Sequence, residues 1–351
     1  MRSSVVERGP DKTEVGGSIP PAPTMRIAFF EVNEKEKNFF EENLKDKDLE
    51  TFYFQEKLQD LKNLPDAQIL CVFINSILNE ENLSKFKNLK LVVTRSTGFD
   101  HIDIDYCKKN KILVSNVPDY GSDTVAEYTF GLMISLLRKI YFAIDRIKET
   151  GVFDFEGLEG VDLKGKTLGV IGTGKIGERV CRIAKCFGMN VLAHDLIKKD
   201  IGVIYKDYFD VLKEADILTF HVPATPDTYH LFNKNCLEIV KKGVYIVNTS
   251  RGSVIETEAL ILGLESGIIA GAALDVLEEE ELLKEELEYL KNSEKVEKLK
   301  SLIENHLLMK HPNVLISPHN AFNSKEAKER ILKTSLDNIL SFLNNSPQNL
   351  I

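Results

Sequence analysis

A glycine-rich turn between an apolar strand and an amphipathic helix constrains the fold of this chain more than any other feature. The turn reads Gly-Thr-Gly-Lys-Ile-Gly over 172–177 and directly follows the apolar run 167–171. A second apolar run, 190–194, ends at Asp195, about 20 residues beyond the turn. A strand, a glycine turn, a helix and a second strand that ends in an acid form the unit that binds dinucleotides. The sequence therefore predicts a Rossmann domain with a site for NAD.

Each part of this unit has its own chemical reason. Gly172 permits the tight turn, Gly174 lets the backbone approach the pyrophosphate, and Gly177 lets the helix pack closely on the strand. The first helical turn offers unpaired N–H groups and partial positive charge to the phosphates. Asp195 would accept hydrogen bonds from the adenosine ribose and repel a 2′-phosphate, which favours NAD over NADP; the alternative is a capping aspartate. The predicted cofactor residues here are Gly172, Gly174, Lys175, Ile176, Gly177 and Asp195.

From Met25 onwards, short apolar runs alternate with amphipathic segments, which is typical of parallel strands joined by helices. The first series predicts strands at 27–31, 51–54, 69–74, 91–94 and 112–115, with helices at 35–44 and 104–109. The second series predicts strands at 167–171, 190–194, 217–220, 244–248, 271–274 and 314–317. The sequence thus indicates an α/β protein with two sets of strands.

Two longer helices flank the second series of strands. Ser122 or Asp123 is placed to cap a helix whose apolar stripe runs from Val125 to Ile140. A last amphipathic helix is predicted over 324–343. Because the sequence stops soon after this helix, we expect no additional regulatory domain.

Two segments are expected to lie outside the packed fold. The segment 278–302 is rich in Glu, Lys and Leu with opposite charges four residues apart, which favours a solvated surface insertion over an interaction surface. The arm 1–24 contains Gly16, Gly17 and several prolines and lacks the apolar core of a secretion signal, so we expect it to be disordered. Because codons for 17–20 can spell the T-arm of a transfer-RNA gene, one hypothesis is that translation begins at Met25; the alternative is an ordinary tail.

Composition excludes several classes of function. The chain has 45 basic and 54 acidic residues and no long basic stripe, which argues against nucleic-acid binding. No window approaches the ~18 consecutive apolar residues of a membrane helix. Five cysteines without a C-x-x-C pair imply neither a disulfide framework nor a metal site, and they indicate a reducing compartment, the cytoplasm.

Polar residues follow three strands of the second series. These segments are 248–252, 273–280 and 317–322, and they contain Arg251, Glu280 and His319. The carboxyl edge of a doubly wound sheet is its binding crevice, so the three side chains are expected to converge there. Arginine, carboxylate and histidine are what the reduction of a 2-keto acid requires. Taken singly, each has an ordinary alternative, as a surface ion pair, a charge on a charged helix and a loop histidine.

From Met25 to its end the sequence resembles the D-isomer-specific 2-hydroxyacid dehydrogenase family, and most closely its D-lactate dehydrogenase-like branch. The motifs that carry the resemblance, in the order of the family, are Gly172-Thr173-Gly174-Lys175-Ile176-Gly177, His221-Val222-Pro223, Asn248-Thr249-Ser250-Arg251-Gly252, Leu274-Asp275-Val276 and Pro318-His319-Asn320-Ala321-Phe322.

The resemblance implies a role for each candidate catalytic residue. Arg251 would bind the substrate carboxylate and polarise the keto oxygen, a task for a planar fork that lysine cannot reproduce. His319 would be the acid/base, and Glu280 would keep its imidazolium available. The run 278–280 makes the choice of carboxylate a question of register, for which we favour Glu280. Because a nearby carboxylate favours the protonated imidazole, Glu280→Gln should narrow the pH range of keto-acid reduction at its alkaline end.

The resemblance also implies contacts to cofactor and substrate. For the substrate, the implied residues are Thr97, Gly98 and Tyr120. Candidates for its side-chain pocket are Phe52, Tyr53, Phe54, Tyr120 and Phe322. Further implied cofactor residues are Val222, Pro223, Thr228, Thr249, Ser250 and Asp275, the last at the nicotinamide carboxamide. The prolines of the loop 222–226 could equally serve packing.

The architecture implied by the resemblance is two doubly wound parallel-sheet domains. A Rossmann NAD domain (126–315) would be inserted into a flavodoxin-like substrate domain (25–125 plus 316–351). A homodimer is implied, with the stripe on 128–140 as its interface, although an interdomain helix would look the same. The expected substrate is a small 2-keto acid such as pyruvate. Alternatives are an NAD-sensing corepressor-like protein and a reductase of larger 2-keto acids or 3-phosphohydroxypyruvate, while the acidic partner argues against a formate dehydrogenase.

Overall fold

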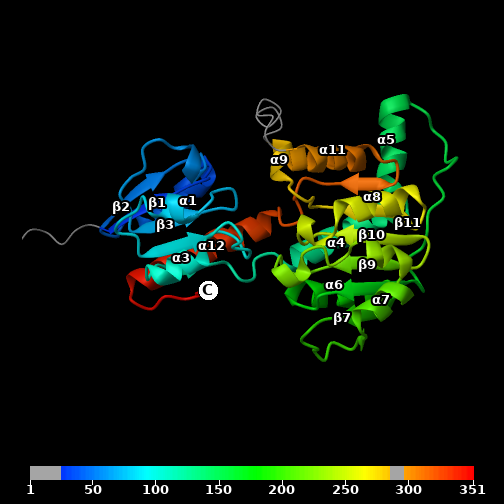
Figure 1. Cartoon of the computed structure of the whole chain (residues 1–351). Coiled ribbons are helices and arrows are strands. Elements are labelled where there is room, and N and C mark those ends of the chain that lie inside the picture. Colours follow the sequence, from blue (N-terminus) through cyan, green and yellow to red (C-terminus); the bar gives the residue numbers. More distant parts are fainter. Residues whose placement is uncertain (1–24, 285–295) are drawn as a thin grey trace, which may run out of the picture.

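The computed structural model describes residues 25–284 and 296–351, which form two parallel β-sheets in separate lobes (Figure 1). The arm 1–24, which we expect to be disordered and for which one hypothesis is a translation start at Met25, lies outside the described residues. Part of the charged segment, 285–295, lies outside them as well.

The smaller lobe is built on a five-stranded sheet of order β2-β1-β3-β4-β5. Every neighbouring pair in it is parallel, and β3 and β4 are buried along their whole length, so their sequences are continuous apolar runs rather than alternating ones. This is the flavodoxin-like doubly wound order. Its strands are β1 (Met25–Phe29), β2 (Leu49–Tyr53), β3 (Ile69–Val72), β4 (Leu91–Thr94) and β5 (Leu113–Ser115).

Helices from both ends of the described chain cover this sheet. The helix α1 (Glu34–Leu44) begins at Asn33, whose side chain and Glu36 form a capping box. The last helix, α12 (Lys325–Leu343), returns from the larger lobe and packs its buried leucines against the same core as α1 (Figure 1). The other helical segments here are η1 (Leu58–Asp60), α2 (Glu80–Leu83) and α3 (Ile104–Lys109).

The larger lobe contains a parallel seven-stranded sheet of order β12-β11-β10-β9-β6-β7-β8. Strand order reverses between β6 and β9, which is the switch point where doubly wound sheets bind ligands. The strands are β6 (Thr167–Ile171), β7 (Asn190–His194), β8 (Ile204–Tyr205), β9 (Ile217–Phe220), β10 (Val244–Asn248), β11 (Ile269–Leu274) and β12 (Val314–Ile316).

Helices cover both faces of this sheet. On one face, α4 (Ser122–Leu137) and α6 (Lys175–Cys186) share a core with β6 and β10. On the other, α7 (Tyr208–Glu214), α8 (Thr257–Glu265) and α11 (Val296–Lys310) bury leucines against the same strands. The remaining helical segments are α5 (Ile140–Thr150), α9 (Glu281–Lys284), η2 (Pro226–Thr228), η3 (Lys234–Glu238) and η4 (Gly252–Val254).

Two expectations for the long helix after Tyr120 are wrong. Gly121 stands at the N-cap, while Ser122 is already helical and its hydroxyl donates to Asp119 at 2.6 Å. The helix also ends at Leu137, because Lys139 adopts a left-handed conformation (φ 52°), and Ile140 begins the separate helix α5. The apolar stripe continues across the break, so spacing alone could not reveal it.

The charged segment 278–302 is less solvated than expected at its described ends. Glu278 is half-buried with polar partners, and Leu302 on α11 is 4% exposed. This part of the chain thus belongs to the packed lobe.

Candidate active site

The predicted site residues follow strands that end at the same edge of the larger sheet. Arg251 follows β10, Glu280 follows β11, and His319 follows β12. These three strands are neighbours in parallel, so their carboxyl ends bring the loops together.

His319 and Glu280 form a direct pair. The imidazole Nδ1 lies 2.6 Å from Oε1 of Glu280, and the two side chains are 28% and 26% exposed. A carboxylate accepts the Nδ1–H, so the other ring nitrogen, Nε2, is the one that can exchange a proton with a ligand. Both residues line a cavity of about 640 Å³.

Asp275 holds the loop that carries His319. Its carboxylate accepts hydrogen bonds from the Ser317 hydroxyl at 2.5 Å and from the N–H groups of Asn320 and Ala321, each at 2.8 Å. Burial raises the pKa of Asp275, and these hydrogen bonds oppose the shift. They also fix His319 in a left-handed conformation (φ 51°), which costs free energy for a non-glycine residue. A contact of Asp275 with the nicotinamide carboxamide stays a prediction.

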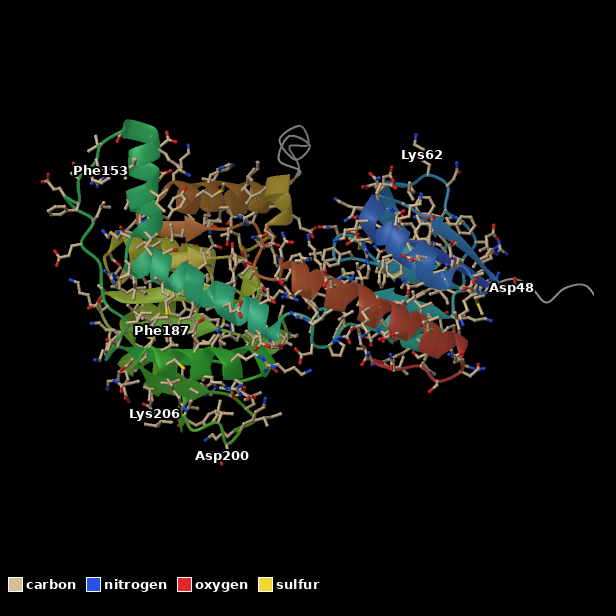
Figure 2. All side chains as sticks on the ribbon, turned by 180° about the vertical axis from the view of Figure 1, so that it is seen from behind. Asp48, Lys62, Phe153, Phe187, Asp200 and Lys206 are labelled. Carbon is tan, nitrogen blue, oxygen red and sulfur yellow. The ribbon has the colours of Figure 1, made fainter. Side chains whose placement is uncertain are left out.

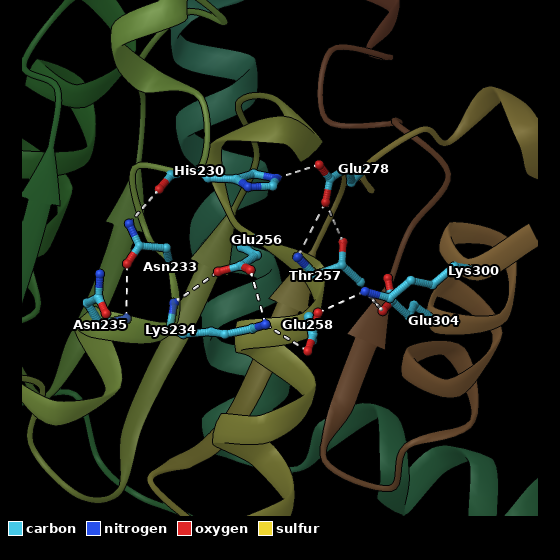
Figure 3. A network of polar contacts seen from close by, with 10 residues as sticks. All are labelled: His230, Asn233, Lys234, Asn235, Glu256, Thr257, Glu258, Glu278, Lys300 and Glu304. Atoms are coloured by element: carbon cyan, nitrogen blue, oxygen red, sulfur yellow. Dashed lines mark hydrogen bonds and ion pairs between the residues drawn. The ribbon is translucent and has the colours of Figure 1, made fainter. Parts of the chain in front are cut away.

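The three adjacent glutamates separate into different environments. Glu278 accepts from His230 Nε2 at 2.6 Å and from the Thr257 hydroxyl at 2.9 Å (Figure 3). Glu279 is exposed, and Glu280 faces His319. Of the three, Glu280 is therefore the one placed beside the histidine, as we favoured from the sequence.

Ion pairs near Glu278 connect α11 and η3 to α8. Glu258 on α8 lies 2.7 Å from Lys234 and 2.8 Å from Lys300 of α11 (Figure 3). Hydrogen bonds from the two lysines hold the pKa of Glu258 at about 2. The described part of the charged insertion is thus docked onto α8.

Arg251 is held between the two lobes. Its Nε and Nη2 atoms each lie 3.2 Å from one oxygen of Asp100, which follows β4 of the smaller sheet, and Nη1 donates to the Ser250 carbonyl at 2.9 Å. Asp100 belongs to the loop that also contains Thr97 and Gly98, the residues predicted to bind the substrate carboxylate.

Aromatic side chains connect the surroundings of Arg251 to His319. Burial raises the pKa of Tyr120, and the positive charge of Arg251 opposes that shift. The Phe322 ring lies 6.4 Å from the ring of Tyr120 and 6.5 Å from that of His319. Phe73, which follows β3, lies 5.8 Å from Phe322 and completes an aromatic wall.

Phe73 is a residue that sequence reasoning missed. It stands just past the carboxyl end of β3, but it lies inside the predicted strand 69–74 and is apolar, so no sequence signal distinguished it. The expected pocket residues of the β2 region instead face the core. Tyr53 stacks on Phe29 at 4.9 Å, Phe54 stacks on Phe30 at 5.2 Å, and Phe52 packs against the same sheet.

The turn between β6 and α6 has the shape that a pyrophosphate needs. Gly172 has φ 92°, and a Cβ there would come within 2.6 Å of the His221 carbonyl oxygen. A Cβ at Gly177 would overlap the Gly172 carbonyl, whereas a Cβ at Gly174 would meet open space. Gly174 is the N-cap of α6 and has no side chain to cap it, so the first-turn N–H groups are available to a phosphate.

Asp195 lies beside the glycine turn with its carboxylate fixed by backbone N–H groups. It lies just past β7 and accepts from the Thr173 N–H at 2.5 Å and the Ile197 N–H at 2.9 Å. Burial alone would raise the pKa of Asp195, but these hydrogen bonds hold it below its usual value. Tyr205, on the unpredicted strand β8, lies 3.0 Å from the Thr173 hydroxyl and so borders this corner.

Several other predicted residues use their side chains to hold loops. The Thr228 hydroxyl contacts the Pro223 carbonyl at 2.6 Å, Thr249 is buried 2.9 Å from Thr129, and the Ser250 hydroxyl donates to Asn248 at 2.8 Å. The Thr97 hydroxyl donates to the Val117 carbonyl at 2.7 Å. Contacts of these residues with ligands stay predictions.

Two further residues border the glycine turn. Lys175 lies 3.4 Å from Asp119, and Val222 lies against the position that a side chain at Gly172 would occupy. Over residues 25–284 and 296–351, no group of three or more His, Cys, Asp or Glu side chains could hold a metal ion. In the same ranges, none of the helices combines the length and apolar character needed to cross a membrane.

Comparison with known proteins agrees with this geometry. Residues 130–321 match the family model described as D-isomer specific 2-hydroxyacid dehydrogenase, NAD binding domain. The chain is 39% identical to 2-hydroxyacid dehydrogenase homolog 1 of Schizosaccharomyces pombe, over 93% of this chain and 99% of that protein. It is 41% identical to the aromatic 2-oxoacid reductase of Clostridium sporogenes, over 76% and 80% of the two chains.

A solved structure shows the same likeness. The D-lactate dehydrogenase from Aquifex aeolicus, complexed with NAD and lactic acid, superposes with a TM-score of 0.80 and is 36% identical, over 91% of this chain and 96% of that one.

Proposed function

Because this chain belongs to the D-isomer-specific 2-hydroxyacid dehydrogenase family, in its D-lactate dehydrogenase-like branch, we propose that it reduces pyruvate to D-lactate and catalyses the reverse oxidation. That it is an NAD-dependent dehydrogenase acting on 2-keto and 2-hydroxy acids follows from the family. The observation that carries the catalytic assignment is the His319–Glu280 pair at 2.6 Å, on the same sheet edge as Arg251.

The proposed roles follow from the chemistry of the three side chains. Arg251 binds the substrate carboxylate and polarises the keto oxygen through charge-assisted hydrogen bonds. His319, protonated, gives a proton to the oxygen as alkoxide charge develops, and Glu280 stabilises the imidazolium before that transfer. Bound NADH supplies the hydride that reaches the carbonyl carbon. In the oxidation direction His319 takes the proton back.

The cofactor residues are proposed from the same geometry. The N–H groups in the first turn of α6 would bind the pyrophosphate, and Gly174 would leave room for it. The ionised carboxylate of Asp195 would accept hydrogen bonds from the ribose hydroxyls and repel a 2′-phosphate. Because Asp195 is already fixed by Thr173 and Ile197, it is oriented before NAD arrives.

A panel of keto acids tests the proposed substrate. Purified protein is incubated with NADH and, separately, pyruvate, 2-ketobutyrate, 2-ketoisocaproate, phenylpyruvate, glyoxylate and 3-phosphohydroxypyruvate. We expect the highest kcat/KM with pyruvate and a product of D configuration. NADH binding without turnover of any of them would instead favour the NAD-sensing corepressor-like protein.

An aromatic 2-keto acid is the second candidate substrate. The wall of Phe73, Tyr120 and Phe322 next to His319 favours it. A higher kcat/KM for phenylpyruvate than for pyruvate in the same panel would select this candidate.

We also propose a homodimer, with an interface different from the expected one. Most of the stripe expected on 128–140 packs on the larger sheet, but α5 buries none of its residues, and Tyr141 and Ile144 on it are about half exposed. Phe153 and Phe155 beyond α5 are each 90% exposed, and Phe153 lies at the end of the larger lobe away from the smaller one (Figure 2). Several large apolar side chains left exposed on and beyond one helix are a feature of protein interfaces.

Sedimentation analysis tests the assembly. We expect a dimer for the wild type and a monomer for the Tyr141→Glu, Ile144→Glu double variant, since two buried charges would oppose association. A wild-type monomer would contradict the dimer.

The cysteines among the described residues are free thiols, and we propose the cytoplasm as the compartment that keeps them reduced.

A further inference from the structure

We propose that Asp100 is a positioning residue that sets which edge of the Arg251 guanidinium faces the substrate. This inference rests on the proposed function, because it concerns how Arg251 receives a 2-keto acid. Asp100 comes from the smaller lobe and Arg251 from the larger one, so their ion pair spans the two sheets.

The donor count of the guanidinium shows what the pair accomplishes. A guanidinium has five N–H donors in a fixed plane. Within the described chain, Nε and one Nη2 hydrogen are directed to Asp100 Oδ2, each at 3.2 Å, and one Nη1 hydrogen is directed to the Ser250 carbonyl. One hydrogen on each terminal nitrogen is left for a ligand. A 2-keto acid offers a carboxylate oxygen beside a carbonyl oxygen, two adjacent acceptors that match these two donors.

The loop that carries Asp100 is held by its own hydroxyl groups. The side chains of Thr94 and Ser96 are buried and lie 2.7 Å apart, and the Ser96 hydroxyl donates to the Gly98 carbonyl at 2.6 Å. Thr94 also lies 3.1 Å from Nε2 of His101. Asp100 is therefore presented from a fixed turn rather than from a mobile loop.

The other neighbours of the guanidinium agree with this arrangement. A Cβ at Gly98 would overlap Nη2 of Arg251, so the guanidinium lies directly against the Gly98 backbone. Burial lowers the pKa of His101 to about 4, so this histidine is neutral near pH 7 and adds no positive charge beside Arg251. Asp100 is the charged partner that remains to orient the arginine.

Because the Arg251–Asp100 ion pair is partly exposed, its effect on substrate binding can be distinguished from any effect on folding stability. The side chains of Arg251 and Asp100 are 36% and 53% exposed. Exposed ion pairs contribute little to folding, so removing Asp100 should leave stability nearly unchanged. The effect should appear where the substrate meets Arg251, and therefore in KM for the keto acid.

Three variants test this role. Asp100→Ala removes both hydrogen bonds, whereas Asp100→Asn keeps an oxygen that can accept them. Asp105→Ala is the matched control, because Asp105 is an exposed aspartate in the next helix of the same segment. With the best keto acid of the panel, we expect Asp100→Ala to raise KM about tenfold and to lower kcat less. Asp100→Asn should return KM to within about threefold of wild type. The control, KM for NADH and all melting temperatures should stay unchanged.

A second readout does not depend on turnover. Titration of the NADH complex with oxamate, an unreactive isostere of pyruvate, should show binding that Asp100→Ala weakens by a similar factor and Asp100→Asn retains. An active wild type whose Asp100→Ala variant has the same KM and oxamate affinity would overturn the positioning role alone, and so would an Asn variant as impaired as the Ala variant. If the wild type binds oxamate with this pattern but reduces no keto acid, the reductase function is wrong and the role of Asp100 stands. No turnover and no oxamate binding would overturn both.

Discussion

Glu278, Glu279 and Glu280 are chemically identical, and their backbone positions alone separate a buried anchor, an exposed charge and the partner of His319. The pairing with His319 matters for chemistry because a carboxylate that accepts the Nδ1–H leaves Nε2 as the ring nitrogen that can exchange a proton with a ligand. The carboxylate also fixes the orientation in which the ring meets that ligand.

Glu280→Gln should lower kcat/KM for keto-acid reduction, because the imidazole loses the carboxylate that accepts its Nδ1–H. We expect kcat/KM to fall about 10- to 100-fold, since proton transfer of this kind contributes on the order of 10²–10⁴. Steady-state kinetics measure the change, with Glu279→Gln as the control because that side chain is exposed. A kcat/KM of Glu280→Gln equal to that of the wild type would remove Glu280 from this role.

At the residue scale, sequence reasoning found side chains with unusual chemistry and missed ordinary ones. Arg251, Glu280 and His319 are polar residues at strand ends, and the structure places them at one edge. Phe73 and Asp100 drew no assignment because an aromatic after a strand and an aspartate in a loop are common. Only the three-dimensional contacts with Phe322 and Arg251 distinguish them.

At the scale of elements, the β6–α6 turn contains one glycine that folding requires, Gly177, and one that cofactor binding should require, Gly174. A side chain at Gly177 would overlap the Gly172 carbonyl, while one at Gly174 would enter open space. Gly174 also has φ −61°, which any residue adopts.

Gly174→Ala should leave the melting temperature nearly unchanged and weaken NAD binding at least about tenfold, because the methyl group would occupy the place of the pyrophosphate. Gly177→Ala should lower the melting temperature by several degrees, since helix and strand must move apart. Thermal melting and calorimetric titration with NAD measure the two effects. Equal behaviour of the two variants would contradict the assignment.

The segment after β11 is fixed by hydrogen bonds from His230 and Thr257 to Glu278. Glu278→Ala would leave His230 and Thr257 without their shared partner, so we expect the free energy of unfolding to fall by about 1–3 kcal/mol. Chemical denaturation measures it, and Glu279→Ala is the control. A Glu278→Ala protein as stable as the control would mean that this anchor is dispensable.

Strands were predicted best where burial on both faces of the sheet gives a continuous run of apolar residues. Strands 91–94, 167–171, 190–194, 217–220 and 244–248 coincide with β4, β6, β7, β9 and β10. The two-residue strand β8 is too short to leave an apolar run, and the break at Lys139 leaves the apolar spacing intact. These features depend on backbone conformation that no residue type signals.

At the scale of the whole molecule, each lobe carries a half-buried histidine in the loop after a strand, His101 after β4 and His221 after β9. Burial lowers the pKa of His101 to about 4 and that of His221 to about 3. In the unfolded chain both bind protons at about pH 6.5, so the unfolded state gains protons first as the pH falls. Their contribution to stability is complete above that pH and is lost toward the folded pKa values.

His101→Gln should therefore lose less stability than the wild type on acidification. Between about pH 6.5 and 4.5 the two slopes should differ by up to about 1.4 kcal/mol per pH unit, the value for one proton. Urea denaturation across this range measures the slopes, and a constant offset above about pH 7 serves as the internal reference. Parallel curves through the acidic range would show that His101 is not held neutral.

The most direct test of the central claim compares the wild type with His319→Asn in NADH oxidation by the keto-acid panel, with NADH affinity measured for both. The wild type should reduce at least one 2-keto acid to the D-hydroxy acid. The activity of His319→Asn should be about 10²- to 10⁴-fold lower, because the proton donor is gone. Its NADH affinity should stay close to that of the wild type. A wild type that binds NADH but reduces none of the acids, or a His319→Asn protein that turns over as fast as the wild type, would contradict catalysis by Arg251, Glu280 and His319.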